Sequence, residues 1–358
     1  MGSEMCIRDS IKIFAEVGVV LIMFSAGLGT NLKTLVKTGP VALLMATMGV
    51  LAPMVLGTII TMVFYGFDPI GSQGFYKALF IGVIMTATSV GITVQTLKEL
   101  GKIKTELGTT IVSAAIIDDV LGIIVLTVVI GVAKGTGTGV GEILLKTLLF
   151  FVAAAVIGFG LYKLFSFLDK RYPHMRRITI FSIALCFALA YVAEKYFGIA
   201  DITGAYVAGV ILCNINDSNY VDRRVNISSY MFFGPIFFAS IGLKTDVSGM
   251  TWGLLAFSVA FVLVALVGKI IGCGLAAKIT RHTWKESLIC GIGMMTRGEV
   301  ALIVSQKGLD AGLITAEDFT PVILLIITSS VIVPILLKVL FKNKKGLSEA
   351  KMAEITNN

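Results

Sequence analysis

The stretch LGTTIVSAAIIDDVLGIIVLTVVIGVA, Leu107–Ala133, places two adjacent aspartates, Asp118 and Asp119, inside a long run with no other charge. A helix of about 20 apolar residues is enough to cross the hydrocarbon core of a bilayer. A carboxylate at the centre of such a helix costs about 2.5–3.5 kcal/mol on insertion scales, and intramembrane charges usually face a cavity or a partner charge. The stretch therefore predicts a membrane-spanning helix that carries a functional site.

The composition of the whole chain is that of a polytopic membrane protein. Of 358 residues, 56% are hydrophobic and 15% are charged, and the mean hydropathy is +0.92. These values exclude a water-soluble globule, where roughly 25% charge is usual. The net charge of +8 does not indicate nucleic-acid binding, because lysine and arginine are scattered singly between apolar runs. The five cysteines form no CxxC pair, so we expect no metal centre, disulfide framework or cofactor.

Apolar runs predict an all-α membrane protein with about eleven transmembrane segments. The first ten residues, MGSEMCIRDS, fit neither an apolar segment nor a signal peptide and are interpreted as a non-native leader. Brief linkers such as Gly135–Gly139 leave no room for a soluble domain, and residues 346–358 are expected to form a tail. The segments are 11–30, 40–65, 76–97, 107–133, 143–168, 177–197, 200–214, 229–244, 250–280, 286–306 and 317–341.

The loops between these segments carry an unequal share of the basic residues. When loops are assigned to the two sides alternately, 20 of the 30 lysines and arginines fall on one side and 8 on the other. Basic residues are enriched in cytoplasmic loops. The pattern predicts a multi-pass protein of the cytoplasmic membrane with its C-terminus in the cytoplasm.

An internal repeat is visible at an offset of about 210 residues. Seven segments separate the equivalent positions, and because seven is odd the two copies are expected to cross the membrane in opposite senses. Inverted repeats of this kind are typical of secondary transporters. The equivalent stretches are Phe24–Leu28 and Phe238–Leu243, Leu79–Gly82 and Leu288–Gly291, and Ile117–Val120 and Thr328–Val331.

Lys269 is a second isolated charge, inside the segment 250–280. Neighbouring helix positions point about 100° apart, so one aspartate can pair with the lysine while the other faces an aqueous cavity. That second carboxylate can then be neutralised by a proton or by a hard cation such as sodium. Adjacent aspartates do not suit an intramembrane aspartyl protease, which needs its two carboxylates on different helices. An ion channel is distinguished by a conductance far above a carrier's turnover.

Two segments are interrupted by polar residues at equivalent positions of the repeat. They are Thr86–Val90 and Met294–Glu299, and both predict discontinuous helices whose ends meet near the membrane midplane. Thr88 and Ser89 offer oxygens to a cation. Arg297 and Glu299 offer charges that compensate the dipoles of the half-helices.

Together these motifs resemble bacterial sodium/proton antiporters of the cation/proton antiporter-2 family. The resemblance covers nearly the whole chain but lacks one or two helices that relatives carry before the first segment, so the chain looks truncated at its N-terminus. The supporting motifs are Thr86–Gly91, Ile117–Val120, Gly204–Gly209, Phe237–Gly242, Gly268–Gly272 and Thr296–Val300.

The resemblance implies an antiporter fold with two crossed discontinuous helices. It further implies a core domain, about 76–133 and 250–341, that moves like an elevator against dimerisation helices lying before and between these ranges. Asp119 would carry the transported sodium and protons, Asp118 would pair with Lys269, and Thr88 and Ser89 would lie near the ion. The Asp-Asp pair is the form associated in this family with electrogenic exchange of two protons for one sodium.

The expected activity is therefore exchange of sodium, or lithium, for protons by a homodimer in the lipid bilayer, and not an enzymatic reaction. A potassium/proton antiporter of the same fold is the nearest alternative. A sodium-coupled symporter for an organic anion shares the architecture, but it would not need Lys269 beside the aspartates.

Overall fold

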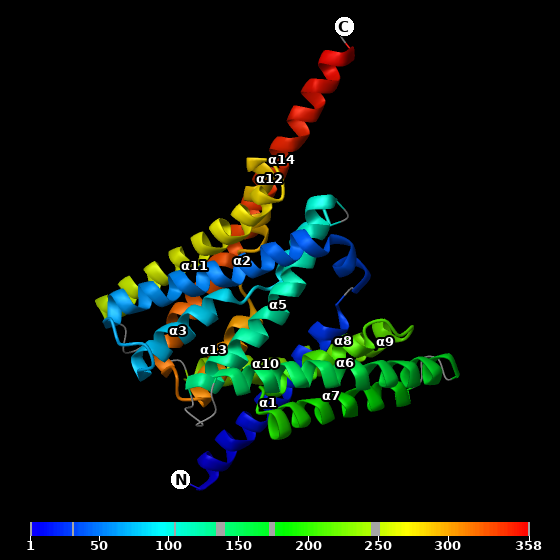
Figure 1. Cartoon of the computed structure of the whole chain (residues 1–358), viewed down its shortest axis with the longest axis vertical. Helices are drawn as coiled ribbons and strands as arrows, with labels where there is room; N and C mark the ends of the chain where they lie inside the picture. The colour runs from blue at the N-terminus through cyan, green and yellow to red at the C-terminus, as the bar shows by residue number, and fades with distance from the viewer. Residues whose placement is uncertain are drawn as a thin grey trace. The chain divides into compact units, whose positions relative to one another are not determined.

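The computed structural model describes residues 2–30, 32–103, 105–133, 140–171, 176–244 and 251–356. Within these ranges the chain forms helices and no strand, and eight helical spans are long and apolar enough to cross a membrane (Figure 1). The predicted all-α polytopic fold is confirmed. The expected linker 135–139 lies outside the described residues. The eight spans are Ser10–Leu28, Gly39–Tyr65, Gln73–Glu99, Glu106–Ala133, Leu145–Phe167, Arg177–Phe197, Trp252–Ile279 and Ala316–Phe341.

The chain divides into two compact units. The first comprises Met1–Lys33 and Thr127–Asp246, and the second comprises Thr34–Leu126 and Val247–Asn358. The sequence-based boundary of the core domain lay at residue 76, whereas the second unit also takes in most of the helix before it. The helix Leu32–Tyr65 joins this unit because glycines of neighbouring helices, such as Gly82 and Gly272, allow their backbones to lie close to it.

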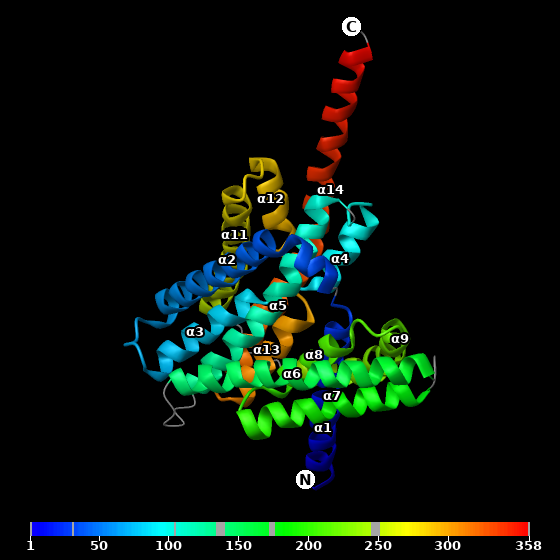
Figure 2. The ribbon, with the colours of Figure 1, turned by 45° about the vertical axis from the view of Figure 1, so that its right-hand side comes forward.

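In the first unit, the short helix α8 packs against α1, α6 and α7, and α6 and α7 lie side by side (Figure 2). A methyl group at Gly209 of α8 would collide with the Phe24 carbonyl oxygen of α1, so the lack of a side chain permits this contact. The helices are α1 (Gly2–Leu28), α6 (Val140–Arg171), α7 (Arg176–Phe197), α8 (Asp201–Leu212), α9 (Ser218–Ser228), a π-helical turn (Ser229–Phe233) and α10 (Gly234–Lys244). Thus α1 already begins at Gly2, within the range interpreted as a leader.

The predicted segment 229–244 begins earlier than the sequence indicated. Helix α9 runs directly into the π-helical turn and α10, so the helical path extends from Ser218 to Lys244. Gly234 and Pro235 do not interrupt this path: the Gly234 N–H donates to the Ser229 carbonyl five residues earlier. A π-turn accommodates proline because Pro235 has no N–H to contribute to the ordinary ladder. Charged residues of α9 lowered its hydropathy and concealed its helical continuity.

The second unit contains the two discontinuous helices. The first is interrupted at 87–89, between α3 and α4, and the second at 294–298, between α12 and α13. Both interruptions were predicted and are confirmed. The helices of this unit are α2 (Leu32–Tyr65), α3 (Gln73–Thr86), α4 (Val90–Glu99), α5 (Glu106–Ala133), α11 (Trp252–Ile279), α12 (Trp284–Gly293), α13 (Glu299–Asp310) and α14 (Phe319–Thr356), with a 3-10 turn at Ala316–Asp318.

The succession of helices follows the internal repeat. A helix, a long helix, a broken helix and another long helix occur in that order as α1, α2, α3–α4 and α5, and again as α10, α11, α12–α13 and α14. The stretches that revealed the repeat lie on equivalent helices of the two copies. The predicted tail differs in structure, because α14 continues as a helix to Thr356.

Helices α2 and α11 approach closely along two glycines of α11 (Figure 1). A methyl group at Gly268 would lie 3.0 Å from the Pro53 Cα, and one at Gly272 would collide with the Met48 carbonyl oxygen. Small residues four apart form a flat face on which another backbone can pack, and this is a common basis of helix association in membranes. The Gly268–Gly272 motif therefore holds α2 against the helix that carries Lys269.

We expect Gly272→Ala to destabilise the protein by about 1–3 kcal/mol, because a methyl group here overpacks a backbone contact. The melting temperature in detergent measures the effect. Gly122→Ala on α5 is the matched control, since nothing lies within 4 Å of its added methyl group and alanine favours the helix. Equal melting temperatures for the two variants would contradict the assigned role of Gly272.

Candidate functional site

The second unit buries a lysine–aspartate ion pair between two of its helices. Lys269 of α11 donates to the Asp118 Oδ1 of α5 at 2.6 Å, and the side chains are 0% and 1% exposed. The sequence predicted this partnership, and the structure brings the two residues together. A buried pair is costly to desolvate, and removal of one partner leaves an uncompensated charge that costs about 3–5 kcal/mol. The pair thus fixes the position of α5 relative to α11.

Helix α2 closes one side of this ion pair with a glycine. A methyl group at Gly49 would lie 3.4 Å from both the Asp118 Oδ1 and the Lys269 Nζ, and 2.6 Å from the Cys273 Sγ. Cys273 in turn approaches the Met45 carbonyl oxygen at 3.4 Å. Neither Gly49 nor Cys273 was singled out from the sequence, because their importance arises from a contact between distant helices. The lack of a side chain at residue 49 brings a helix backbone next to the charges.

Asp119 has a different environment from its neighbour. Its side chain is 8% exposed, and its Oδ1 is buried without a hydrogen-bond partner among the described residues. A buried, unpaired carboxylate oxygen is costly in a membrane interior. A proton or a metal cation at this oxygen removes the cost, so Asp119 is chemically suited to hold either one.

The two interruptions of the discontinuous helices meet through a set of hydrogen bonds. The Ser89 N–H donates to the Thr296 carbonyl at 2.9 Å, and the Thr296 hydroxyl donates to the Ser89 carbonyl at 3.0 Å. The Thr93 hydroxyl lies 2.7 Å from the Thr296 hydroxyl and 3.0 Å from the Gly293 carbonyl. Irregular backbone at membrane depth must be satisfied by the protein itself, and these contacts do so.

Thr88 and Ser89, the predicted ion-binding hydroxyls, both lie at this crossing and are fully buried. The Thr88 hydroxyl donates to the Met294 carbonyl at 3.4 Å, and the Ser89 hydroxyl accepts from the Ile92 N–H at 3.4 Å as the N-cap of α4. In this conformation both hydroxyls stabilise the crossing. Their role as ion ligands stays a prediction.

Sequence reasoning missed Thr93, although its position contained a signal. Thr93 lies four residues after Ser89, and residues four apart share a helix face. A hydroxyl one turn beyond a predicted interruption is therefore placed to contact the same crossing. Thr296 was not predicted to make a contact either, although it lies within the Thr296–Val300 motif.

Arg297 lies fully buried behind the crossing. Its guanidinium donates to the Met85 carbonyl at 2.7 Å and to the Met294 carbonyl at 3.3 Å. These carbonyls lie at the C-terminal ends of α3 and α12, where helix dipoles carry partial negative charge and carbonyls lack helical partners. The position suits the predicted role of Arg297 in compensating helix dipoles, and the structure places it at the C-terminal ends of two half-helices. The backbone N–H of Arg297 also donates to the Ser329 hydroxyl at 3.1 Å, a contact that was not predicted from the sequence.

Glu299 is the first residue of α13 and directly follows the interruption at 294–298. Its carboxylate lies near the Ser89 side chain. A negative charge at a helix N-terminus is stabilised by the partial positive charge of the dipole. Glu299 therefore lies at a helix N-terminus, whereas Arg297 contacts carbonyls at two helix C-terminal ends.

The fold has close counterparts among solved structures. It is similar to the sodium proton antiporter MjNhaP1 from Methanocaldococcus jannaschii, with a TM-score of 0.68, 18% sequence identity, and coverage of 92% of this chain and 85% of that chain. At this level of identity the similarity establishes the fold alone.

Sequence comparison identifies closer relatives. The chain is 37% identical to the Na(+)/H(+)-K(+) antiporter GerN of Bacillus cereus over 342 residues, which cover 94% of this chain and 84% of that protein. It is 32% identical to a Na(+)/H(+) antiporter of Enterococcus hirae, over 91% of this chain and 83% of that protein. The family model for the transmembrane part of sodium/hydrogen exchangers matches residues 2–343. The chain therefore belongs to the sodium/hydrogen exchanger family.

Proposed function

We propose that this protein exchanges sodium or lithium for protons across the cytoplasmic membrane. The observation that carries the proposal is the buried Asp119, whose unpaired carboxylate oxygen lies next to the Asp118–Lys269 ion pair. Hard cations bind oxygen ligands, and a carboxylate binds a proton or a metal ion but not both at the same oxygen. Competition between the two at Asp119 couples their movement in opposite directions.

The Lys269 side chain determines the charge of the loaded site. In the proton-loaded state Lys269 is charged, Asp118 is ionised and Asp119 is protonated, which gives a net charge of zero. When sodium binds between two ionised aspartates, Lys269 is released from its partner and gives up its proton, which leaves a net charge of minus one. The two loaded states then differ by one charge, so two protons move for one sodium and the exchange is electrogenic.

The second unit is the part that we propose to move as an elevator. All residues assigned to ion binding and charge compensation belong to this unit. A body that contains its own site can expose it to alternate sides without separating the ligands. The first unit would then supply the stationary scaffold of a homodimer. The surplus of basic residues in alternate loops supports a cytoplasmic C-terminus.

Potassium is the second candidate cation. The Bacillus cereus relative is a Na(+)/H(+)-K(+) antiporter, so its name includes potassium as well as sodium. Carboxylate and carbonyl oxygens bind both ions, and discrimination depends on the dimensions of the site and on dehydration. Sodium and potassium are therefore distinguished by the concentration of each cation that drives exchange.

Asp119→Asn is expected to reduce exchange to the rate of protein-free vesicles, because the amide binds neither a proton nor a cation in place of the carboxylate. Dequenching of a pH-sensitive dye after sodium addition to acid-loaded proteoliposomes measures the rate. Asp310→Asn makes the same change at an exposed residue of the same unit and should leave exchange intact. Normal exchange by a well-folded Asp119→Asn protein would contradict the assignment.

Lys269→Gln is expected to make transport electroneutral, because the second proton carrier is lost while Asp119 remains. Current on a solid-supported membrane should disappear while dye-detected proton movement continues. Lys338→Gln, an exposed change on α14 of the same unit, is the control and should retain current. Undiminished current in Lys269→Gln would show that the lysine serves the structure only.

A concentration series of sodium, lithium and potassium under one fixed pH gradient tests the choice of cation. We expect sodium and lithium to dissipate the gradient at lower concentrations than potassium, since smaller cations interact more strongly with a carboxylate at short range. If potassium reached half-maximal exchange at the same concentration as sodium, or at a lower one, the protein would be a potassium/proton antiporter.

A further inference from the structure

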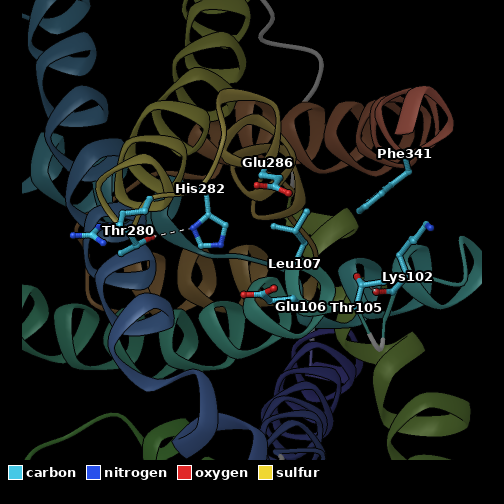
Figure 3. Close-up of a pocket in the computed structure, with 9 residues that line it drawn as sticks. Lys102, Thr105, Glu106, Leu107, Thr280, His282, Glu286 and Phe341 are labelled. Carbon is cyan, nitrogen blue, oxygen red and sulfur yellow. Dashed lines mark hydrogen bonds between the residues drawn. The ribbon is translucent and has the colours of Figure 1, made fainter. Parts of the chain in front are cut away.

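A cavity of about 450 Å³ lies at one end of the second unit, away from the ion site. It is lined by Lys102 and Thr105–Leu107 near the start of α5, by Thr280–His282 after α11, by Glu286 of α12 and by Phe341 of α14. Figure 3 shows His282 on one side and Lys102 with Phe341 on the other, with Glu286 and Glu106 between them. Its volume lies within the range of small-ligand sites, about 300–1,000 Å³.

Three membrane spans place this cavity at the surface of the bilayer. The span Glu106–Ala133 begins at the cavity, and the spans Trp252–Ile279 and Ala316–Phe341 end at it. Trp284, which follows the cavity-lining turn, is 71% exposed, and the Lys278 Nζ lies 5.0 Å from its ring centroid. Exposed tryptophans are enriched at the membrane interface. The cavity therefore lies at the level of the lipid headgroups.

Two apolar stripes lead from the hydrocarbon region to the rim of the cavity. One stripe on α11 ends at Ile279, directly before the lining residue Thr280, and one on α14 ends at Val339, near the lining residue Phe341. Residues four apart follow one helix face, so acyl chains can lie along both stripes. The exposed residues are Val259, Leu263, Val267, Ile271, Leu275 and Ile279 on α11, and Ile327, Val331, Ile335 and Val339 on α14.

The polar lining carries both signs of charge. Lys102, Arg281 and His282 offer hydrogen-bond donors, and Glu106 offers acceptors, whereas the Glu286 carboxylate already accepts from the Thr283 N–H in the capping box of α12. No ion pair joins Lys102 or Arg281 to Glu106 within the part of the chain that the structure describes. A ligand that combines a phosphate with a primary ammonium group satisfies both sets, because phosphate accepts from the bases and ammonium donates to the Glu106 carboxylate.

Arg281 occupies a backbone conformation that disfavours its side chain. Its φ is 69°, and every other described residue with positive φ is a glycine. Glycine takes this conformation without steric cost, whereas other residues do not. An arginine here is thus unfavourable for the turn itself, yet the residue is part of the cavity lining. This combination indicates that the side chain serves a ligand.

We propose that the cavity binds the headgroup of a phosphoethanolamine lipid from the leaflet that faces the basic loops. The phosphate contacts Arg281 and the neighbouring His282, the ammonium group contacts Glu106, and the acyl chains follow the exposed stripes of α11 and α14. The stripes favour a membrane lipid over a free solute of the same polar chemistry. This site does not depend on the proposed transport activity, because its evidence is the cavity and the ends of the spans.

The test is the melting temperature of the full-length, detergent-purified chain during titration with dihexanoyl-phosphatidylethanolamine. A ligand that binds the folded state raises the melting temperature with concentration. We expect half-saturation at a concentration several-fold lower than for the phosphatidylglycerol and phosphatidylcholine analogues. Equal half-saturation by all three lipids would overturn the proposal, as would equal binding of free phosphoethanolamine or inorganic phosphate.

Arg281→Gly separates a ligand-binding role from a structural one. Glycine relieves the backbone, so the melting temperature without lipid should stay equal or rise, while affinity for phosphatidylethanolamine should fall about tenfold through loss of charged hydrogen bonds. Lys338→Ala removes one charge near the same end without lining the cavity and should leave affinity unchanged. Glu106→Gln should abolish the preference for ethanolamine over glycerol headgroups. Unchanged lipid affinity in Arg281→Gly would overturn the assignment.

Discussion

The second unit depends on one electrostatic constraint: a charge or a free backbone group in the membrane interior must find its partner within the protein. Asp118 and Lys269 satisfy it by pairing at 2.6 Å with almost no exposure. The pair joins α5 to α11, and Gly49 of α2 lies directly against it. Asp119 keeps a buried carboxylate oxygen without a hydrogen-bond partner among the described residues. The neighbouring Asp118 is paired with Lys269, whereas the carboxylate oxygen of Asp119 is open to a proton or a cation.

The same constraint explains the crossing of the discontinuous helices. Interrupting two helices frees carbonyls and N–H groups that a lipid environment does not satisfy. Thr93 and Thr296 pair with backbone groups across the crossing, and Arg297 takes up carbonyls from both C-terminal ends. Polar residues that look isolated along the chain thus form one connected group. The hydrogen bonds of Thr93, Thr296 and Arg297 therefore tie the two discontinuous helices together.

The sequence predicted much of this arrangement because membrane burial makes polar residues conspicuous. The Asp118–Asp119 pair, Lys269 and both interruptions stood out against apolar surroundings. Glycine and cysteine do not stand out in such a background, so Gly49 and Cys273 were not predicted to lie beside the ion pair. Helix α9 was missed for the opposite reason, since its charged residues resembled those of a loop.

The sequence by itself determined the membrane class, the interruptions of two helices and the identity of the buried charges, because each follows from local composition and the cost of placing charge in lipid. Only the tertiary structure decided which oxygens and donors meet. The backbone partners of Thr296 and Arg297 and the cavity around Arg281 join segments far apart in the chain. Such contacts depend on how helix faces pack, and composition along a single segment does not specify that.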